Sequence, residues 1–149
     1  MDAKTIIRTG FELWNAHDRD GLLALYDDSV VFFDQPWGHQ LGGREEVGKG
    51  SYDLWTDAYP DNECKDLVVF GEGELVCCQG RFVGTHTGIL PGPAGEIPPT
   101  GKQVDGPFVF IAEVRDDKIT RAWHYYDRLL VLEQEGIVSL DKLFAAQTA

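Results

Sequence analysis

The feature that most constrains this fold is a change of hydrophobic periodicity near Cys64. Before this point apolar residues recur at the spacing of an amphipathic helix, and after it they alternate with a period of two. Helices followed by a run of strands predict an α+β domain. We expect a curved, mostly antiparallel sheet packed against three N-terminal helices, which gives a conical barrel with a deep apolar cavity.

Three helices are predicted in the first third of the chain. The first carries one apolar stripe through Ile6, Ile7, Gly10, Phe11, Trp14 and His17. Asp18 or Asp20 can cap a short second helix, and Gly42-Gly43 precedes a third that ends before Pro60. A brief β-prone run, 30–33, lies between the second and third helices.

Two hairpins are predicted in the rest of the chain. Residues 64–70 and 75–87 form the first, and residues 104–115 and 118–127 form the second, turning at Asp116-Asp117. The Gly/Pro-rich segment 88–103 between them is long for a loop, which indicates a functional or lid-like segment. We expect one domain over residues 1–149, with 139–149 as a short helix or a frayed tail.

Composition excludes several classes of partner. The net charge is −12 and no basic stripe offsets it, so nucleic acid and anionic membranes are not expected partners. No apolar segment is long enough to span a bilayer and the N-terminus lacks signal-peptide features, which predicts a cytoplasmic protein. Cys64, Cys77 and Cys78 have no CxxC spacing, and no metal-binding motif is present, so neither disulfides nor a metal is expected.

Asp127 is the main catalytic candidate. It follows a strand rich in aromatic residues, where scarce water would raise the carboxyl pKa toward a value useful for proton transfer. Strand alternation places Trp123 and Tyr125 on its face, and His124 on the opposite one. The alternative is that Asp127 only caps the helix that begins after it.

His86 is the second catalytic candidate. Phe82, Gly84 and His86 share one strand face, and the glycine leaves room for a ligand. A neutral imidazole there could donate to a carbonyl oxygen that becomes an enolate. The alternative is a core histidine bonded to the backbone.

The same segments resemble the SnoaL-like polyketide cyclases of the nuclear-transport-factor-two-like superfamily. The resemblance is carried by Gly84-Thr-His-Thr-Gly88, Pro99-Thr-Gly-Lys102, Lys118-Ile119 with Trp123 and Asp127, and Leu129-Leu130 with Glu133-Gln-Glu-Gly136. It implies a cofactor-free enzyme that closes a ring by intramolecular aldol condensation, with Asp127 as general acid/base. Glu135 departs from the family pattern, which has an apolar residue there.

The resemblance also implies an apolar small-molecule substrate and a homodimer or higher homo-oligomer. Isomerase, dehydratase or epoxide hydrolase chemistry in the same cavity, and a non-catalytic small-molecule-binding domain, remain alternatives. The expected substrate-binding residues are Phe33, Asp34, Trp37, His39, Trp55, Phe82, Phe108, Trp123, His124 and Tyr125.

Overall fold

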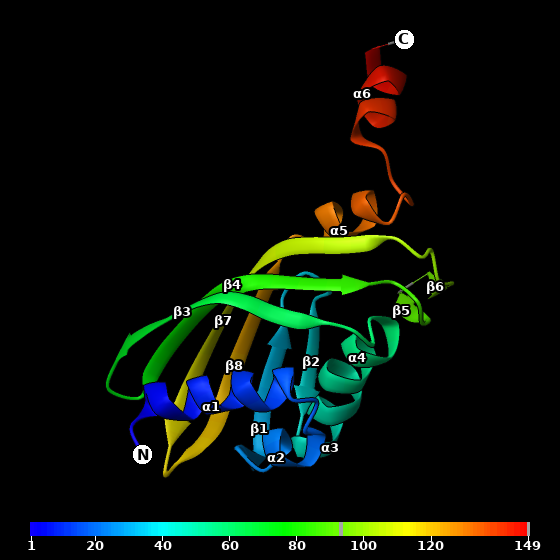
Figure 1. The fold of residues 1–149 in the computed structure, drawn as a ribbon. Helices are drawn as coiled ribbons and strands as arrows, with labels where there is room; N and C mark the ends of the chain where they lie inside the picture. The colour runs from blue at the N-terminus through cyan, green and yellow to red at the C-terminus, as the bar shows by residue number, and fades with distance from the viewer. Residues whose placement is uncertain (93, 149) are drawn as a thin grey trace.

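The N-terminal helices lie against one face of a curved sheet in the computed structural model, which describes residues 1–92 and 94–148 (Figure 1). The helical segments on this face are α1 (Ala3–Asn15), α2 (Arg19–Leu23), α3 (Arg44–Val47), η1 (Gly48–Asp53) and α4 (Leu54–Ala58). Two helices follow the last strand, α5 (Arg128–Gln134) and α6 (Leu140–Thr148). Helix α6 extends away from the rest of the molecule (Figure 1).

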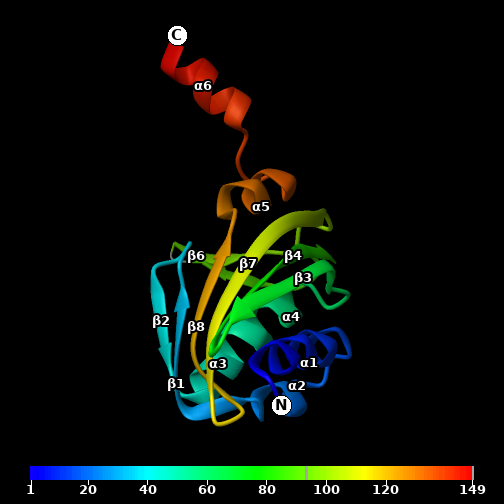
Figure 2. The same ribbon diagram turned by 90° about the vertical axis from the view of Figure 1, so that its left-hand side faces the viewer.

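The main sheet has six strands in the order β2-β1-β8-β7-β4-β3. Their bounds are β1 (Tyr26–Asp34), β2 (His39–Gly42), β3 (Glu63–Glu72), β4 (Leu75–Thr85), β7 (Gln103–Arg115) and β8 (Lys118–Tyr126). Strands β1 and β8 pair in parallel, and the other neighbours pair antiparallel. Figure 2 shows α1 to α4 gathered on one side of this sheet. The predicted α+β fold with a mostly antiparallel, curved sheet is therefore confirmed.

Local sequence explains where the helices begin. Asp2 caps α1 by accepting a hydrogen bond from the Thr5 N–H at 2.7 Å, and Asp18 caps α2 by accepting from the Gly21 N–H at 2.9 Å. The third predicted helix is one continuous run of α3, η1 and α4, whose middle turns are π-helical. It starts after Gly43, whose φ of 87° suits glycine.

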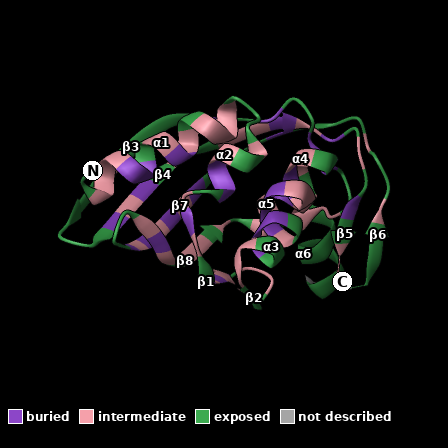
Figure 3. Cartoon of the chain, turned by 90° about the horizontal axis from the view of Figure 1, so that it is seen from below, coloured by how far each residue is buried: buried purple, intermediate pink, exposed green. Residues whose placement is uncertain are grey.

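Alternation in β7 separates the core from the outer surface of the sheet. Val104, Phe108, Phe110, Ala112 and Val114 are buried, while the residues between them are less buried. The buried set faces the helices, and Figure 3 shows buried segments concentrated between the two layers. This interior layer is where a cavity can form.

Two segments differ from the sequence-based expectation. His39, expected in a loop, begins β2, which pairs with β1 through the Asp34–His39 register. The segment 88–103, expected to be an irregular loop, contains the short paired strands β5 (Leu90–Gly92) and β6 (Gly95–Ile97). Short strands of this kind are hard to predict because only a few residues carry the pattern. No helix in the described part of the chain is both long and apolar enough to cross a membrane.

Candidate active site

An apolar cavity of about 90 Å³ lies between the helices and the inner face of the sheet. Its walls come from α1, α2, η1 and α4, from strands β1, β3, β4, β7 and β8, and from Asp127 and α5. The lining residues that bear on function are Phe11, Trp14, Ser51, Trp55, Phe82, Phe108, His124, Tyr126 and Asp127. An apolar cavity of about 150 Å³ is known to hold a benzene molecule, so even a ligand with one aromatic ring requires this cavity to widen.

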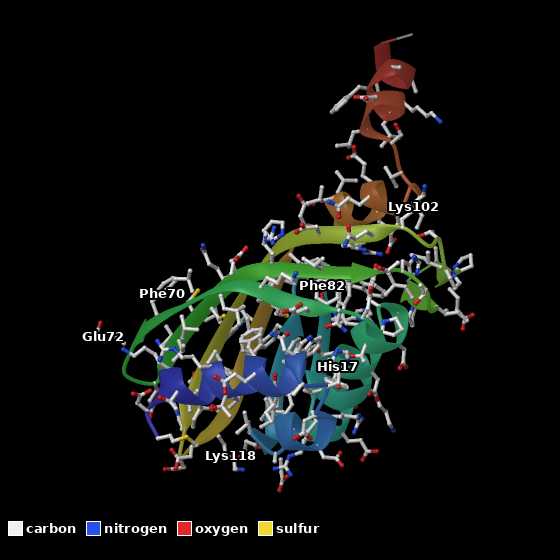
Figure 4. The ribbon with its side chains drawn as sticks, viewed as in Figure 1. His17, Phe70, Glu72, Phe82, Lys102 and Lys118 are labelled. Atoms are coloured by element: carbon white, nitrogen blue, oxygen red, sulfur yellow. The ribbon has the colours of Figure 1, made fainter. Side chains whose placement is uncertain are left out.

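Four expected binding residues line this cavity: one tryptophan, two phenylalanines and His124. Trp55 comes from α4, Phe108 from β7, and Phe82, labelled in Figure 4, from β4. The Trp55 and Phe82 rings meet edge to face with centroids 5.5 Å apart. Such contacts form a rigid wall for an apolar ligand.

His124 lines the cavity within a shell of aromatic rings. Its ring centroid lies 4.8 Å from that of Tyr126, 6.2 Å from that of Phe108 and 6.3 Å from that of Phe32. These apolar surroundings disfavour the charged form, and burial lowers the pKa of His124 to about 4. The imidazole is therefore neutral near pH 7, with one nitrogen able to donate and the other able to accept.

Tyr126 and Asp34 form the buried acid pair of the site. Tyr126 lines the cavity, and its hydroxyl donates to Asp34 Oδ1 at 3.2 Å. Burial raises the pKa of Asp34, although hydrogen bonds from the Trp37 N–H and the Tyr126 hydroxyl partly oppose this effect. Burial and the neighbouring Asp34 charge also raise the pKa of Tyr126. Asp34 itself does not line the cavity and reaches it only through Tyr126.

Asp127 stands where the cavity approaches solvent, and its side chain is exposed. It caps α5, because its Oδ1 accepts a hydrogen bond from the Leu130 N–H at 2.9 Å. The expectation that this carboxylate is surrounded by apolar groups is therefore wrong. The strand ends at Tyr126 and the backbone turns into the helix, which carries the next side chain to the rim. Its catalytic role stays a prediction.

The sequence pattern predicted that the face of β8 with Trp123 and Tyr125 lines the cavity, and this prediction is wrong. Trp123 and Tyr125 share a face as predicted, but His124 and Tyr126 are the residues that line the cavity. On the outer face, the Trp123 ring stacks on Phe33 with centroids 5.8 Å apart and an interplanar angle of 10°. Aromatic residues occupy both faces of β8, so hydrophobicity alone could not distinguish them. Phe33, Trp123 and Tyr125 are thus not cavity residues.

Trp37 and His39 also lie outside the cavity lining. Their rings contact each other with centroids 5.4 Å apart, and the guanidinium carbon of Arg128 lies 4.6 Å from the centroid of the Trp37 ring. The backbone N–H of Trp37 donates to Asp34 Oδ1 at 3.3 Å. This turn supports Asp34 through its backbone, whereas its side chains were expected to bind the substrate.

His86 belongs to a second buried polar cluster rather than to the cavity. Its side chain is fully buried, with Nδ1 3.0 Å from Thr100 Oγ1 and 3.5 Å from Glu135 Oε1. Glu135 also accepts a hydrogen bond from the Tyr59 hydroxyl, and burial followed by this bond raises the pKa of Tyr59. Strand β4 ends at Thr85, so the strand face that was expected to present His86 to a ligand does not continue to it. We call these four side chains the sealed cluster.

Two important residues were not selected from the sequence. Tyr126 was correctly placed on the same face of β8 as His124, but that face was not taken as the cavity face, although the pairing of Tyr126 with Phe108 in the sheet register indicates it. Glu135 was noted only as a departure from the family pattern, suggesting an altered helix surface or subunit contact, whereas its side chain is only 2 % exposed. Neither residue belongs to a metal site, and no group of three or more His, Cys, Asp or Glu that could hold a metal occurs within residues 1–92 and 94–148.

The family model described as SnoaL-like polyketide cyclase matches residues 4–135. This match supports an enzyme of the cyclase or isomerase type. No functionally curated protein matches the sequence.

Solved structures of similar shape include candidate polyketide cyclases. One from Xanthomonas campestris pv. campestris has a TM-score of 0.78 at 24% identity, over 89% of this chain and 96% of that chain. A SnoaL-like protein from Jannaschia sp. CCS1 has a TM-score of 0.79 at 22% identity, over 93% and 95%. IdmH from Streptomyces antibioticus has a TM-score of 0.74 at 22% identity, over 91% and 99%. At these identities the likeness establishes the fold alone.

Proposed function

Because this chain belongs to the SnoaL-like polyketide cyclase family, we propose that it is a cofactor-free enzyme that transfers protons on an apolar, carbonyl-bearing small molecule. The leading reaction is an intramolecular aldol cyclisation of a polyketide-like substrate. The observation that supports it is the position of Tyr126, which directly precedes Asp127 in the chain, lines the apolar cavity and hydrogen-bonds to the buried carboxyl group of Asp34.

Asp127 is proposed as the general acid/base. Its Oδ1 is engaged with the helix N-terminus, and no described residue donates a hydrogen bond to its other oxygen. That oxygen would remove a proton from the carbon next to a substrate carbonyl. The resulting enolate attacks a second carbonyl, which closes the ring, and Asp127 returns its proton to the new alkoxide. General acid/base catalysis of this type contributes about 10²–10⁴-fold in rate.

Tyr126 is proposed to stabilise the enolate oxygen, a role first considered for His86. A hydroxyl held in a site that excludes water is an effective donor to a developing negative charge. Asp34 keeps Tyr126 in place by accepting a hydrogen bond from its hydroxyl at 3.2 Å, and in the proposed step that hydroxyl turns from Asp34 to the enolate oxygen. The hydroxyl proton of Tyr126 is then available to the substrate.

The test measures α-hydrogen exchange, which needs no knowledge of the natural substrate. Aryl ketones and β-keto esters are incubated with the protein in D₂O, and loss of the α-proton signal is followed by NMR. We expect exchange faster than in buffer, and a loss of about 10²-fold or more in Asp127→Asn. Asn also caps helices well, so this change leaves α5 intact.

Asp18→Asn is the matched control, because Asp18 is another exposed carboxylate that caps a helix and does not line the cavity. Its exchange rate should stay within about twofold of the wild type. Undiminished exchange in Asp127→Asn would remove Asp127 from the mechanism. Binding of the ketones without accelerated exchange would instead favour the alternative of a non-catalytic binding domain.

A homodimer formed through the outer face of the sheet is part of the proposal. An apolar row crosses the strands there through the pairs Phe70–Cys77, Cys77–Ile111, Ile111–Trp123 and Trp123–Phe33. Phe70 is 53% exposed and lies on the outer side of the β3–β4 hairpin (Figure 4). Exposed apolar faces of this kind are typical of association surfaces.

Sedimentation velocity at micromolar concentration tests the dimer. The double change Phe70→Ser and Tyr125→Ser should convert a dimer to a monomer, whereas Leu143→Ser on α6 should not. A monomeric wild type would contradict this part of the proposal, and loss of the dimer only in Leu143→Ser would assign the contact to α6.

A further inference from the structure

The indole N–H of Trp55 is a buried donor without an acceptor. The residue is 5% exposed, and its Nε1 has no hydrogen-bond partner among residues 1–92 and 94–148. An unsatisfied buried donor costs roughly 1–3 kcal/mol, so proteins seldom keep one without a reason. The position therefore calls for an acceptor that a bound molecule could supply.

Trp55 lies among the residues that carry the proposed chemistry. It lines the cavity, and its ring meets that of Tyr126 edge to face with centroids 5.0 Å apart and an interplanar angle of 90°. Its ring centroid is also 6.5 Å from that of His124. A ligand that fills the cavity thus contacts Trp55 and Tyr126 together, and it reaches the buried Nε1 of Trp55 as the cavity widens to admit it.

Trp14 provides an internal comparison. It lines the same cavity, but its Nε1 donates to Asn62 Oδ1 at 2.7 Å. Asn62 is only 2% exposed, and its own Nδ2 donates to the Tyr59 carbonyl oxygen at 2.8 Å. The fold therefore satisfies one cavity tryptophan completely and leaves the other with a free donor.

The other buried side-chain atoms without a partner lie elsewhere. They are His86 Nε2 and Glu135 Oε2, both in the sealed cluster and neither in a residue that lines the cavity. Within the described part of the chain, Trp55 is thus the cavity residue with an unsatisfied buried donor. This combination distinguishes it from the general polar core.

We propose that Trp55 Nε1 binds an oxygen acceptor of the substrate, so that the site selects ketones or esters over hydrocarbons of equal shape. The inference rests on the proposed function, since it uses the same cavity and deepens its substrate class. A carbonyl oxygen fixed by Trp55 would be oriented beside Tyr126. The apolar remainder of the substrate would occupy the space lined by Phe11, Phe82 and Phe108.

The first experiment observes the donor directly in the wild-type protein. The indole N–H signals of ¹⁵N-labelled protein are recorded during titration with acetophenone and, separately, with ethylbenzene, which has a CH₂ group where acetophenone has its carbonyl. Trp55→Phe identifies the Trp55 signal by its disappearance. We expect acetophenone to move this proton downfield and ethylbenzene not to do so, because only the ketone accepts a hydrogen bond. The Trp14 signal, already bonded to Asn62, should show no such difference.

The second experiment measures the affinity that the donor contributes. The wild type should bind acetophenone about 3- to 10-fold more tightly than ethylbenzene, the range expected of one neutral hydrogen bond. In Trp55→Phe the two affinities should agree within about twofold, while Trp14→Phe keeps the preference for the ketone. Both experiments score binding, so they can succeed even where Asp127→Asn shows that the proposed catalysis is wrong.

Three results would overturn the inference. The first is that the Trp55 proton does not move downfield with acetophenone, as expected if a water molecule already accepts its hydrogen bond. The second is that the preference for the ketone persists in Trp55→Phe. The third is that neither acetophenone nor ethylbenzene binds at millimolar concentration, which would mean that the cavity does not admit molecules of this class.

Discussion

Two buried polar clusters differ in whether a ligand can reach them. Asp34 and Tyr126 lie beside the cavity, and Tyr126 is part of its wall. The sealed cluster of Tyr59, His86, Thr100 and Glu135 joins the ends of α4, β4 and α5 to the segment before β7, with no member in the cavity lining.

Burial of titratable groups therefore does not by itself identify a catalytic site. Burial raises the pKa of Tyr59 and of Tyr126 alike, yet only Tyr126 can meet a substrate. Perturbed groups also occur in structural networks, so access to a cavity is the stronger criterion. We therefore expect changes near the cavity to alter turnover, and changes in the sealed cluster to alter stability.

The largest expected effect is on turnover in Tyr126→Phe. The variant keeps the ring but loses the hydroxyl that would stabilise the enolate, so the α-hydrogen exchange rate should fall by about 10²-fold or more. The matched change in the sealed cluster, Tyr59→Phe, should leave the rate of the folded protein within about threefold. Equal losses in the two variants would abolish the distinction between the clusters.

The next effect is on stability in Glu135→Leu. The Tyr59 hydroxyl then loses its buried acceptor and His86 loses the neighbouring carboxyl group, so the free energy of unfolding should fall by about 2–4 kcal/mol. Urea denaturation measures this change. Glu133→Leu, an exposed position of the same helix, should change the free energy of unfolding by less than about 0.5 kcal/mol. A small loss in Glu135→Leu would mean that the sealed cluster does not hold the fold together.

The pH dependence of stability tests His124. The pKa of His124 is about 4 in the folded protein and 6.5 for an unperturbed histidine, as in the unfolded chain. Between pH 4 and pH 6.5 the unfolded chain therefore binds more protons than the folded protein. Stability should therefore fall as the pH drops from 6.5 to 4, by at most about 3 kcal/mol. His124→Phe should remove this slope. His17→Asn, at an exposed position with a φ of 57° that Asn tolerates, should retain it.

The smallest expected effect is a gain of stability in Asp34→Asn. Burial raises the pKa of Asp34, so its charged form is unfavourable in the fold at neutral pH, and this penalty disappears as the pH falls. Replacing it with a neutral side chain should raise the free energy of unfolding at pH 7 by about 1 kcal/mol while lowering turnover. A loss of stability would indicate that Asp34, like Glu135, serves the structure.

Much of the fold followed from local patterns. The positions of α1, the cap at Asp18 and the β7–β8 hairpin were predictable, because capping, helical spacing and strand alternation depend on neighbouring residues. Strand β2 and the β5–β6 pair were not, since their few residues gain stability mainly from the strands they pair with. The site was predicted less well. Trp55, Phe82, Phe108, His124 and Asp127 line the cavity, whereas His86 and Trp123 do not.

The order of residues is enough to show which side chains share a strand face, because alternation is a property of the extended backbone. Long-range packing, in contrast, is what turns His124 and Tyr126, rather than Trp123 and Tyr125, toward the helices. Both faces of β8 are aromatic, so the choice depends on which face α1 and α4 cover. The same long-range packing buries Glu135 against Tyr59 and leaves the donor of Trp55 without a partner.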